Sequence, residues 1–167
     1  MRGEDKRMDA SKHLYEMIKD FRTAMLVTRG AGGTQHARPM AVAELRPDAE
    51  AWFVTSLDSP KIAELEKDPG ALITFQSATE FATVEGTLSI VRDQAEIDRL
   101  WSDTWKLWFP KGKQDPSLCL LKFVAERGEY WDNSGFEGIR YVFEGMKSRM
   151  EGRRPRVDEG QHAKVNL

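Results

Sequence analysis

Apolar residues recur first with a helical period and then mostly with the two-residue period of β-strands. Leu14, Met17, Ile18 and Phe21 follow the spacing i, i+3, i+4, i+7, which predicts an amphipathic helix over about residues 11–20. The later segments are rich in β-branched and aromatic residues and are separated by short runs of Gly, Pro, Asp and Asn. We expect strands at 23–29, 34–45, 51–56, 71–77, 80–91, 118–125 and 127–132.

The segment 80–91 alternates most cleanly: from 82 to 90 the even positions are Ala, Val, Gly, Leu and Ile, and the odd positions are polar. This pattern predicts a strand that is half buried in an antiparallel sheet. Two further helices are expected, one after Ser59-Pro60 and one after Asp93, where Glu96 completes a capping-box pattern. The apolar stripe expected on the second of them is Ile97, Leu100, Trp101, Trp105 and Trp108.

Six or seven short strands with few helices indicate a mainly β protein with peripheral helices, built as a small barrel or sandwich rather than as a parallel α/β fold. We expect a flexible N-terminus over residues 1–10 and one folded domain over 11–137. Residues 138–152 are expected to form a helix, and the remainder to 167 a polar tail with too few apolar residues to fold alone.

The charge balance argues against partners that are recognised through a strong overall field. The chain has 25 Lys and Arg against 27 Asp and Glu, a net charge of -2, so neither nucleic acid nor an anionic membrane is expected as a partner. The N-terminus has no signal-peptide pattern, and no apolar run approaches the roughly 20 residues of a membrane span. We expect a cytoplasmic protein.

Few residues point to chemistry carried by the polypeptide itself. Cys119 lies in an apolar run and is expected to be an inert core thiol, and the three histidines are too scattered for a metal cluster. The sequence contains no recognisable nucleophile triad and no dinucleotide-binding glycine pattern. If the protein is an enzyme, its chemistry is expected to come from a bound cofactor.

A lysine stands where a helix normally favours negative charge. Ser59-Pro60 is an ordinary helix start, yet Lys61 falls in the first turn, where the helix dipole favours an anion. Arg38 can reach the same end of the sheet if its strand pairs with strand 51–56, and its planar fork matches phosphate oxygens. The alternatives are a solvated lysine whose stem covers apolar surface and an arginine on an exposed strand.

The tryptophans divide into two groups. Trp101, Trp105 and Trp108 have helical spacing, which favours packing in a core or a subunit interface over a platform for a cofactor. Trp131 closes the last expected strand beside a loop, where its indole either packs at the rim or stacks on a planar ligand.

Four segments together carry a family resemblance: "ARPMAVAEL", "AWFVTSLDSPKIAELEKDPGALITF", "FATVEGTLSIVRD" and "LWFPKGKQDPSLCLLKFVAERGEYWD". In this order and spacing the chain resembles the pyridoxamine 5'-phosphate oxidase-like FMN-binding split barrels, in particular the general stress protein branch. The resemblance implies a six-stranded antiparallel split β-barrel that forms a homodimer, with two FMN sites at the interface and both chains lining each.

The resemblance also assigns roles to individual residues. Arg38 and Lys61 would hold the FMN phosphate, beside Ser59 and the helix N-terminus. Val54 and Thr55 would meet the flavin through backbone and hydroxyl groups, and Trp131 would approach the flavin from the other subunit. The residues that would wall the flavin ring are Trp108 and Phe109.

Two departures from the true oxidases bear on the substrate. Pro60 replaces a basic residue and removes one phosphate contact, and "DNSGFEG" follows Trp131 in place of an Arg-x-His stretch that binds the substrate's phosphate. We therefore expect an FMN-dependent oxidoreductase whose substrate is not pyridoxamine phosphate. FAD or a deazaflavin in place of FMN is the less favoured alternative for the cofactor. The alternatives are a non-catalytic stress protein that buffers or senses flavin, and a structural barrel without a cofactor.

Overall fold

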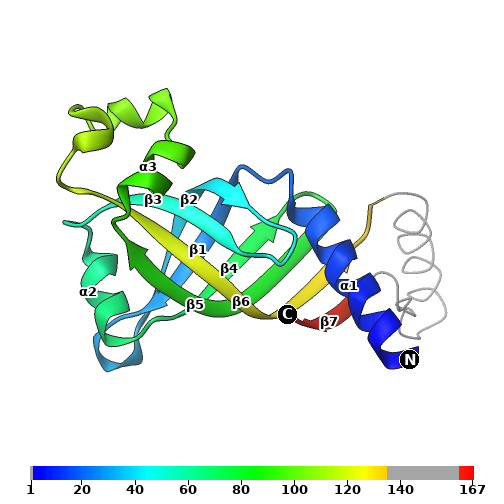
Figure 1. Cartoon of the computed structure of the whole chain (residues 1–167). Helices are drawn as coiled ribbons and strands as arrows, with labels where there is room; N and C mark the ends of the chain where they lie inside the picture. The colour runs from blue at the N-terminus through cyan, green and yellow to red at the C-terminus, as the bar shows by residue number, and fades with distance from the viewer. Residues whose placement is uncertain (1, 135–161) are drawn as a thin grey trace.

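The computed structural model describes residues 2–134 and 162–167 of the 167-residue chain (Figure 1). Three α-helices and seven strands are found in these ranges, together with three short 3₁₀ turns, at Ala31–Gly33, Asp103–Leu107 and Gly112–Gln114. The helices are α1 (Arg2–Ile18), α2 (Pro60–Lys67) and α3 (Gln94–Leu100). The strands are β1 (Thr23–Arg29), β2 (Gln35–Leu45), β3 (Ala51–Ser56), β4 (Gly70–Gln76), β5 (Glu80–Val91), β6 (Leu118–Asp132) and β7 (His162–Asn166).

Strands β1 to β6 form a closed antiparallel barrel. Their order is β3-β2-β1-β4-β5-β6, and β3 also pairs with β6, so that the sheet returns on itself. β7 pairs with the second half of β6, at Arg127 to Trp131, beyond the part that β3 occupies. The predicted six-stranded antiparallel barrel is therefore confirmed. None of the helices in the described ranges is long and apolar enough to cross a membrane.

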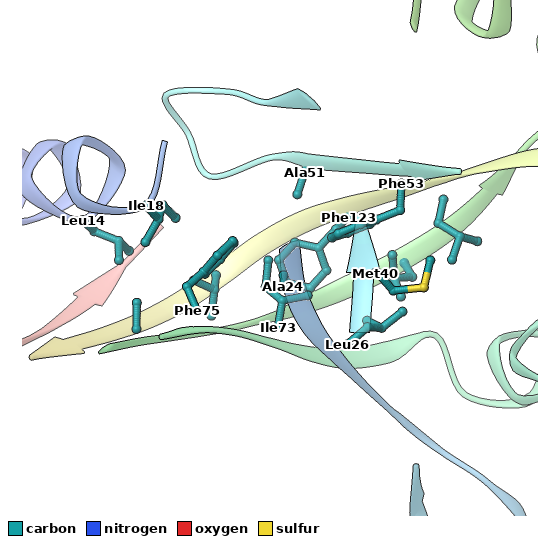
Figure 2. Packing of buried hydrophobic residues seen from close by; sticks show 14 of the residues in the cluster. Leu14, Ile18, Ala24, Leu26, Met40, Ala51, Phe53, Ile73, Phe75 and Phe123 are labelled. Atoms are coloured by element: carbon teal, nitrogen blue, oxygen red, sulfur yellow. The ribbon is translucent and has the colours of Figure 1, made fainter. Parts of the chain in front are cut away.

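The barrel interior is filled by the alternate side chains that the strand pattern predicts. Figure 2 shows them pointing towards one another from several strands, with the α1 side chains of Leu14 and Ile18 at one end of the same cluster. Both of these α1 residues are fully buried. At the opposite end of the barrel α2 contacts β1 and β5 (Figure 1).

A second apolar cluster lies between the outside of the barrel and the segment from α3 to β6. α3 begins as predicted, because the Asp93 carboxylate accepts a hydrogen bond of 2.9 Å from the Glu96 backbone N–H. It then ends at Leu100, and the chain continues in a separate 3₁₀ turn. The cluster consists of Trp52, Ile97, Trp105, Phe109, Leu118 and Leu120.

The single helical stripe running from Ile97 to Trp108 is a wrong prediction. Trp101 has φ −52° and ψ 132°, an extended conformation that breaks the helical period. Trp101 and Trp105 still pack edge to face, with ring centroids 5.7 Å apart, which agrees with the predicted packing role. Trp108 instead points to solvent and is 75% exposed.

Three further boundaries differ from the expected ones. α1 begins at Arg2 and ends at Ile18, rather than spanning about 11–20. The two strands expected at 118–125 and 127–132 are one 15-residue strand, β6, with a register shift opposite Glu85 and Gly86. The end of the expected polar tail forms β7, while the helix expected at 138–152 lies outside the described residues.

Candidate functional site

The capping residue of α2, Ser59, bonds to a side chain instead of to the helix backbone. Ser59 has the extended backbone of an N-cap, with φ −72° and ψ 135°, and Pro60 follows at the first helical position. The Ser59 hydroxyl makes no capping hydrogen bond to the helix backbone. Instead it accepts a hydrogen bond of 2.6 Å from the Lys61 ammonium group. The side chain that normally caps the helix is thus turned towards a cation.

Lys61 is a buried cation. Only 9% of the residue is exposed, and its Nζ also donates to the Thr55 hydroxyl at 2.8 Å. Within the described ranges no carboxylate oxygen lies within 4.0 Å of this ammonium group. Burial lowers the pKa of Lys61, and the positive charge of Arg38 lowers it further. The alternative of a solvated lysine therefore does not describe Lys61.

Arg38 reaches the same end of the barrel, as predicted, because β2 and β3 pair in antiparallel register. Its Nη1 donates to the Thr28 hydroxyl at 2.5 Å and its Nη2 donates to Glu64 Oε2 at 3.1 Å. The guanidinium group has five N–H donors, so these two contacts leave donors for a ligand. Arg38 and Lys61 thus place two positive charges together where α2 meets the barrel.

Glu64, which the sequence interpretation did not single out, is the anionic member of this group. Its carboxylate accepts hydrogen bonds from the Thr28 hydroxyl and the His36 ring, each at 2.5 Å, in addition to the one from Arg38. The Thr28 hydroxyl, ahead of His36 and Arg38, lowers the pKa of Glu64 from its ordinary 4.5 to about 2. We call the whole group the α2 cluster. Its members are Thr28, His36, Arg38, Thr55, Ser59, Lys61 and Glu64.

Val54 and Thr55 present their side chains to opposite faces of β3. Thr55 is buried and belongs to the α2 cluster, whereas Val54 packs against the second apolar cluster outside the barrel. Cys119 lies opposite Thr55 on β6, where its thiol donates to the Thr55 carbonyl at 3.6 Å. Burial raises the pKa of Cys119 to about 11, which agrees with the expected inert core thiol.

Trp131 lies at the far end of the barrel from the α2 cluster. Cys119 and Trp131 stand near opposite ends of β6, and about 40 Å of extended strand separates them. The indole stacks on the His162 ring of β7 with centroids 5.1 Å apart and an angle of 9° between the planes. One chain therefore does not bring Trp131 together with Arg38 and Lys61.

A hollow of about 500 Å³ lies beside Trp131 on the outside of the barrel. Phe81, which is 39% exposed, stands directly opposite Trp131 in the β5–β6 register and also lines the hollow. We call this space the Trp131 hollow. Its lining includes Thr74, Gln76, Phe81, Thr83, Trp131 and Asn133.

Trp108 and Phe109 have different surroundings although they are adjacent in sequence. Phe109 is buried in the second apolar cluster, 4% exposed, while Trp108 and its neighbour Leu107 project into solvent. Phe109 is thus fixed by packing, and Trp108 is the one of the two whose ring is accessible to a ligand or a partner.

The chemistry of the α2 cluster suits a phosphate group. A buried ammonium group bonded only to hydroxyls, an arginine fork with remaining donors and a helix N-terminus are all groups that bind phosphate oxygens. In the described ranges, no group of three or more His, Cys, Asp or Glu side chains could hold a metal ion. The donors of the α2 cluster are thus of the kind that can bind an anion.

The fold places the chain among the small closed antiparallel β-barrels, with the α2 cluster at one end and Trp131 at the other. The model of the family described as pyridoxamine 5'-phosphate oxidase like matches residues 9–156. The chain belongs to this family, and the resemblance inferred from the sequence is confirmed.

Solved structures with the same fold include proteins named for general stress. A putative general stress protein 26 from Jannaschia sp. CCS1 is 26% identical, with a TM-score of 0.71, and the match covers 96% of this chain and 99% of that chain. The general stress FMN/FAD binding protein from Xanthomonas citri is 33% identical, with a TM-score of 0.63, and the match covers 79% and 92% of the two chains.

A pyridoxamine 5'-phosphate oxidase-related, FMN binding protein from Nostoc punctiforme is similar in fold alone. Its identity is 16% and its TM-score 0.61, over 95% of each chain. Comparison with curated proteins finds no match.

Proposed function

We propose that this chain binds FMN and acts as an FMN-dependent oxidoreductase on a small substrate other than pyridoxamine phosphate. The observation that carries the proposal is Lys61, a buried ammonium group at a helix N-terminus. It lies next to Arg38, and its partners among the described residues are two hydroxyls. A buried cation without a carboxylate partner is costly unless an anion accompanies it. The phosphate of FMN supplies that anion.

In the proposed complex the residues of the α2 cluster hold the phosphate and thereby fix where the flavin lies. Lys61 and Arg38 donate charge-assisted hydrogen bonds, and the Ser59 hydroxyl and the N-terminal amides of α2 complete the surroundings. Val54 and Thr55 stand at the adjoining end of β3 to meet the isoalloxazine ring. FMN supplies the hydride or electron transfer, and the polypeptide binds and orients it.

A homodimer is part of the proposal, because Trp131 is remote from the α2 cluster of its own chain. The central part of the outer face of β2, β1 and β4 offers an uncharged surface for a second copy, and Arg29 stands at its edge. The inward positions Leu26, Met40 and Ile73 alternate with outward side chains that are small or apolar and at least partly exposed. These outward residues are Met25, Val27, Ala37, Pro39, Ala41 and Leu72.

The Trp131 hollow is continuous with this outer face through Thr74, which pairs with Met25 in the β1–β4 register. If two copies pack through this outer face, the Trp131 hollow of one copy therefore lies against the surface of the second copy. This arrangement would give a flavin site lined by both chains, with Trp131 contributed across the interface.

The test is a comparison of FMN with riboflavin, which lacks the phosphate. Replacing both Lys61 and Arg38 by Ala is expected to weaken FMN binding about 100-fold or more, because each charge-assisted contact contributes about 1.5 to 3 kcal/mol. Riboflavin binding should stay unchanged, and it also reports that the variant is folded. Quenching of flavin fluorescence gives both dissociation constants.

Lys67→Ala is the matched control, since Lys67 is an exposed cation at the other end of α2. It should leave both affinities unchanged. Equal losses for FMN and riboflavin in the double variant would contradict the phosphate assignment. If the wild type binds neither flavin, the structural barrel without a cofactor is the correct description.

Turnover is tested separately from binding. A flavin that NADH or NADPH bleaches in the absence of oxygen supports the oxidoreductase. A bound flavin that neither donor reduces favours the non-catalytic stress protein. The test needs no assumption about the substrate, because reduction of the flavin is read from its own absorbance.

A further inference from the structure

The α2 cluster contains a carboxylate as well as two cations. Arg38 and Lys61 carry one positive charge each, and Glu64 carries one negative charge. The side chain of Glu64 is 11% exposed, so water screens its charge only in part. The charges of Arg38, Lys61 and Glu64 therefore sum to a single positive charge rather than to two.

Glu64 does not depend on Arg38 for its position. Its Oε1 accepts from the His36 ring and its Oε2 accepts from the Thr28 hydroxyl, which is itself 1% exposed. These two contacts come from β2 and β1, so the carboxylate is fixed by the barrel. When a phosphate takes up the remaining donors of Arg38, Glu64 stays where it is, as a negative charge beside the ligand.

We propose that Glu64 is a specificity-determining residue that reduces the preference of the α2 cluster for a doubly charged phosphomonoester over a singly charged phosphodiester. The inference rests on the proposed function, since it concerns the same phosphate position. A phosphomonoester such as FMN carries close to two negative charges above pH 7, and a phosphodiester carries one. A site with one net positive charge neutralises the diester fully and leaves the monoester in excess.

The consequence is that the cluster accepts flavins whose phosphate is esterified on both sides. Without Glu64 the two negative charges of FMN would meet two uncompensated cations, and FMN would be favoured strongly. With Glu64 present, the second negative charge of FMN adds little to the binding free energy. The chemical class that the cluster admits is therefore a flavin joined through either a terminal or a bridging phosphate.

The probes are riboflavin, FMN and the methyl phosphodiester of riboflavin, which differ only at the phosphate. Affinities are measured at pH 8, where the FMN phosphate is doubly charged. In the wild type, FMN and the methyl diester should bind within about threefold of each other. In Glu64→Gln, which keeps the size and an accepting oxygen, FMN should gain about tenfold over the diester. Riboflavin should bind equally to both proteins.

Glu66→Gln is the matched control. It removes the same charge from the same helix, at an exposed position outside the α2 cluster, and should keep the wild-type ratio. An unchanged ratio of FMN to diester in Glu64→Gln, or a shift towards the diester, overturns the inference. A merely structural role for Glu64 would weaken all three ligands together and leave the ratio unchanged.

If Glu64→Gln fails to fold, the ratio of the FMN and diester affinities of the wild type tests the inference alone. A preference for FMN over the diester of more than about 30-fold would overturn the inference without any variant. These outcomes differ from failure of the proposed function. In that case riboflavin and FMN bind equally to the wild type, or no flavin binds, and this inference is refuted together with it.

Discussion

Replacing Glu64 by Gln should lower the free energy of unfolding at neutral pH and leave it unchanged in strong acid. Glu64 accepts hydrogen bonds from three side chains, and these contacts depress its pKa from 4.5 to about 2. A carboxyl group with a depressed pKa in the folded state stabilises the fold above the unfolded pKa. That stabilisation disappears as the pH falls through the folded value. The relevant window therefore extends from about pH 5 down to about pH 2.

The magnitude follows from the size of the shift. At about 1.4 kcal/mol per pKa unit the full shift corresponds to about 3 kcal/mol. Solvent at the open side of the α2 cluster screens part of this, which leaves about 2 kcal/mol. A chain of this length should then melt about 4 to 8 °C lower.

Urea unfolding of wild type, Glu64→Gln and the exposed control Glu66→Gln measures this effect at pH 7 and at pH 3, at one protein concentration. The deficit of Glu64→Gln should be about 2 kcal/mol at pH 7 and clearly smaller at pH 3. Loss of other carboxylate contacts in acid is common to all three proteins and cancels in the difference. A deficit that is the same at both pH values, or no deficit relative to Glu66→Gln, would refute the reasoning.

Two other expectations concern the ends of β6. Trp131→Ala should weaken the binding of FMN and of riboflavin by the same factor, about tenfold, because the indole is proposed to contact the flavin ring and not the phosphate. A loss of affinity confined to FMN would argue against ring contact. Cys119 should resist alkylation at pH 8 in the folded protein and react at once in denaturant, because its thiol is buried with a pKa of about 11. Mass spectrometry of the alkylated protein checks this. Rapid labelling of the folded chain would contradict it.

The sequence was most informative where one local rule acted alone. The alternation in 80–91 gave β5 almost to the residue, and the Asp93 cap was found where the capping pattern lay. The prediction of one helical stripe from Ile97 to Trp108 is wrong because the chain begins a new 3₁₀ turn at Ser102 and Asp103, which the spacing of the apolar residues does not show. Short helical periods cannot show whether the chain turns between two apolar positions.

The expected strands 118–125 and 127–132 leave Glu126 between them, whereas β6 runs through Glu126 and Gly128 without a break. In the structure a Cβ atom at Gly128 would lie 2.7 Å from the Leu14 side chain, so the glycine lets α1 approach the strand. Such a close approach is a tertiary requirement that no local pattern expresses. β7 did leave a signal, because Ala163, Val165 and Leu167 alternate with polar residues, but a short polar strand is convincing only when its partner is known.

The candidate site was predictable in its cations and not in its anion. Lys61 was suggested by its charge at a helix start, and Arg38 by the strand beside it. Glu64 looked like an ordinary helix residue, since its role depends on Thr28 and His36 of the β1–β2 hairpin. Thr28 and His36 stand directly opposite each other in that hairpin, so the pair could have been found from the register once the hairpin was assigned.

β7 also bears on how the molecule avoids aggregation through an exposed strand edge. A closed barrel has no free edge, yet β6 continues past its junction with β3 and would expose unpaired N–H and C=O groups from Arg127 to Trp131. β7 covers this edge with residues from the very end of the chain. A chain cut before His162 would leave the edge open to a strand from another molecule, so the last residues act as a guard against aggregation.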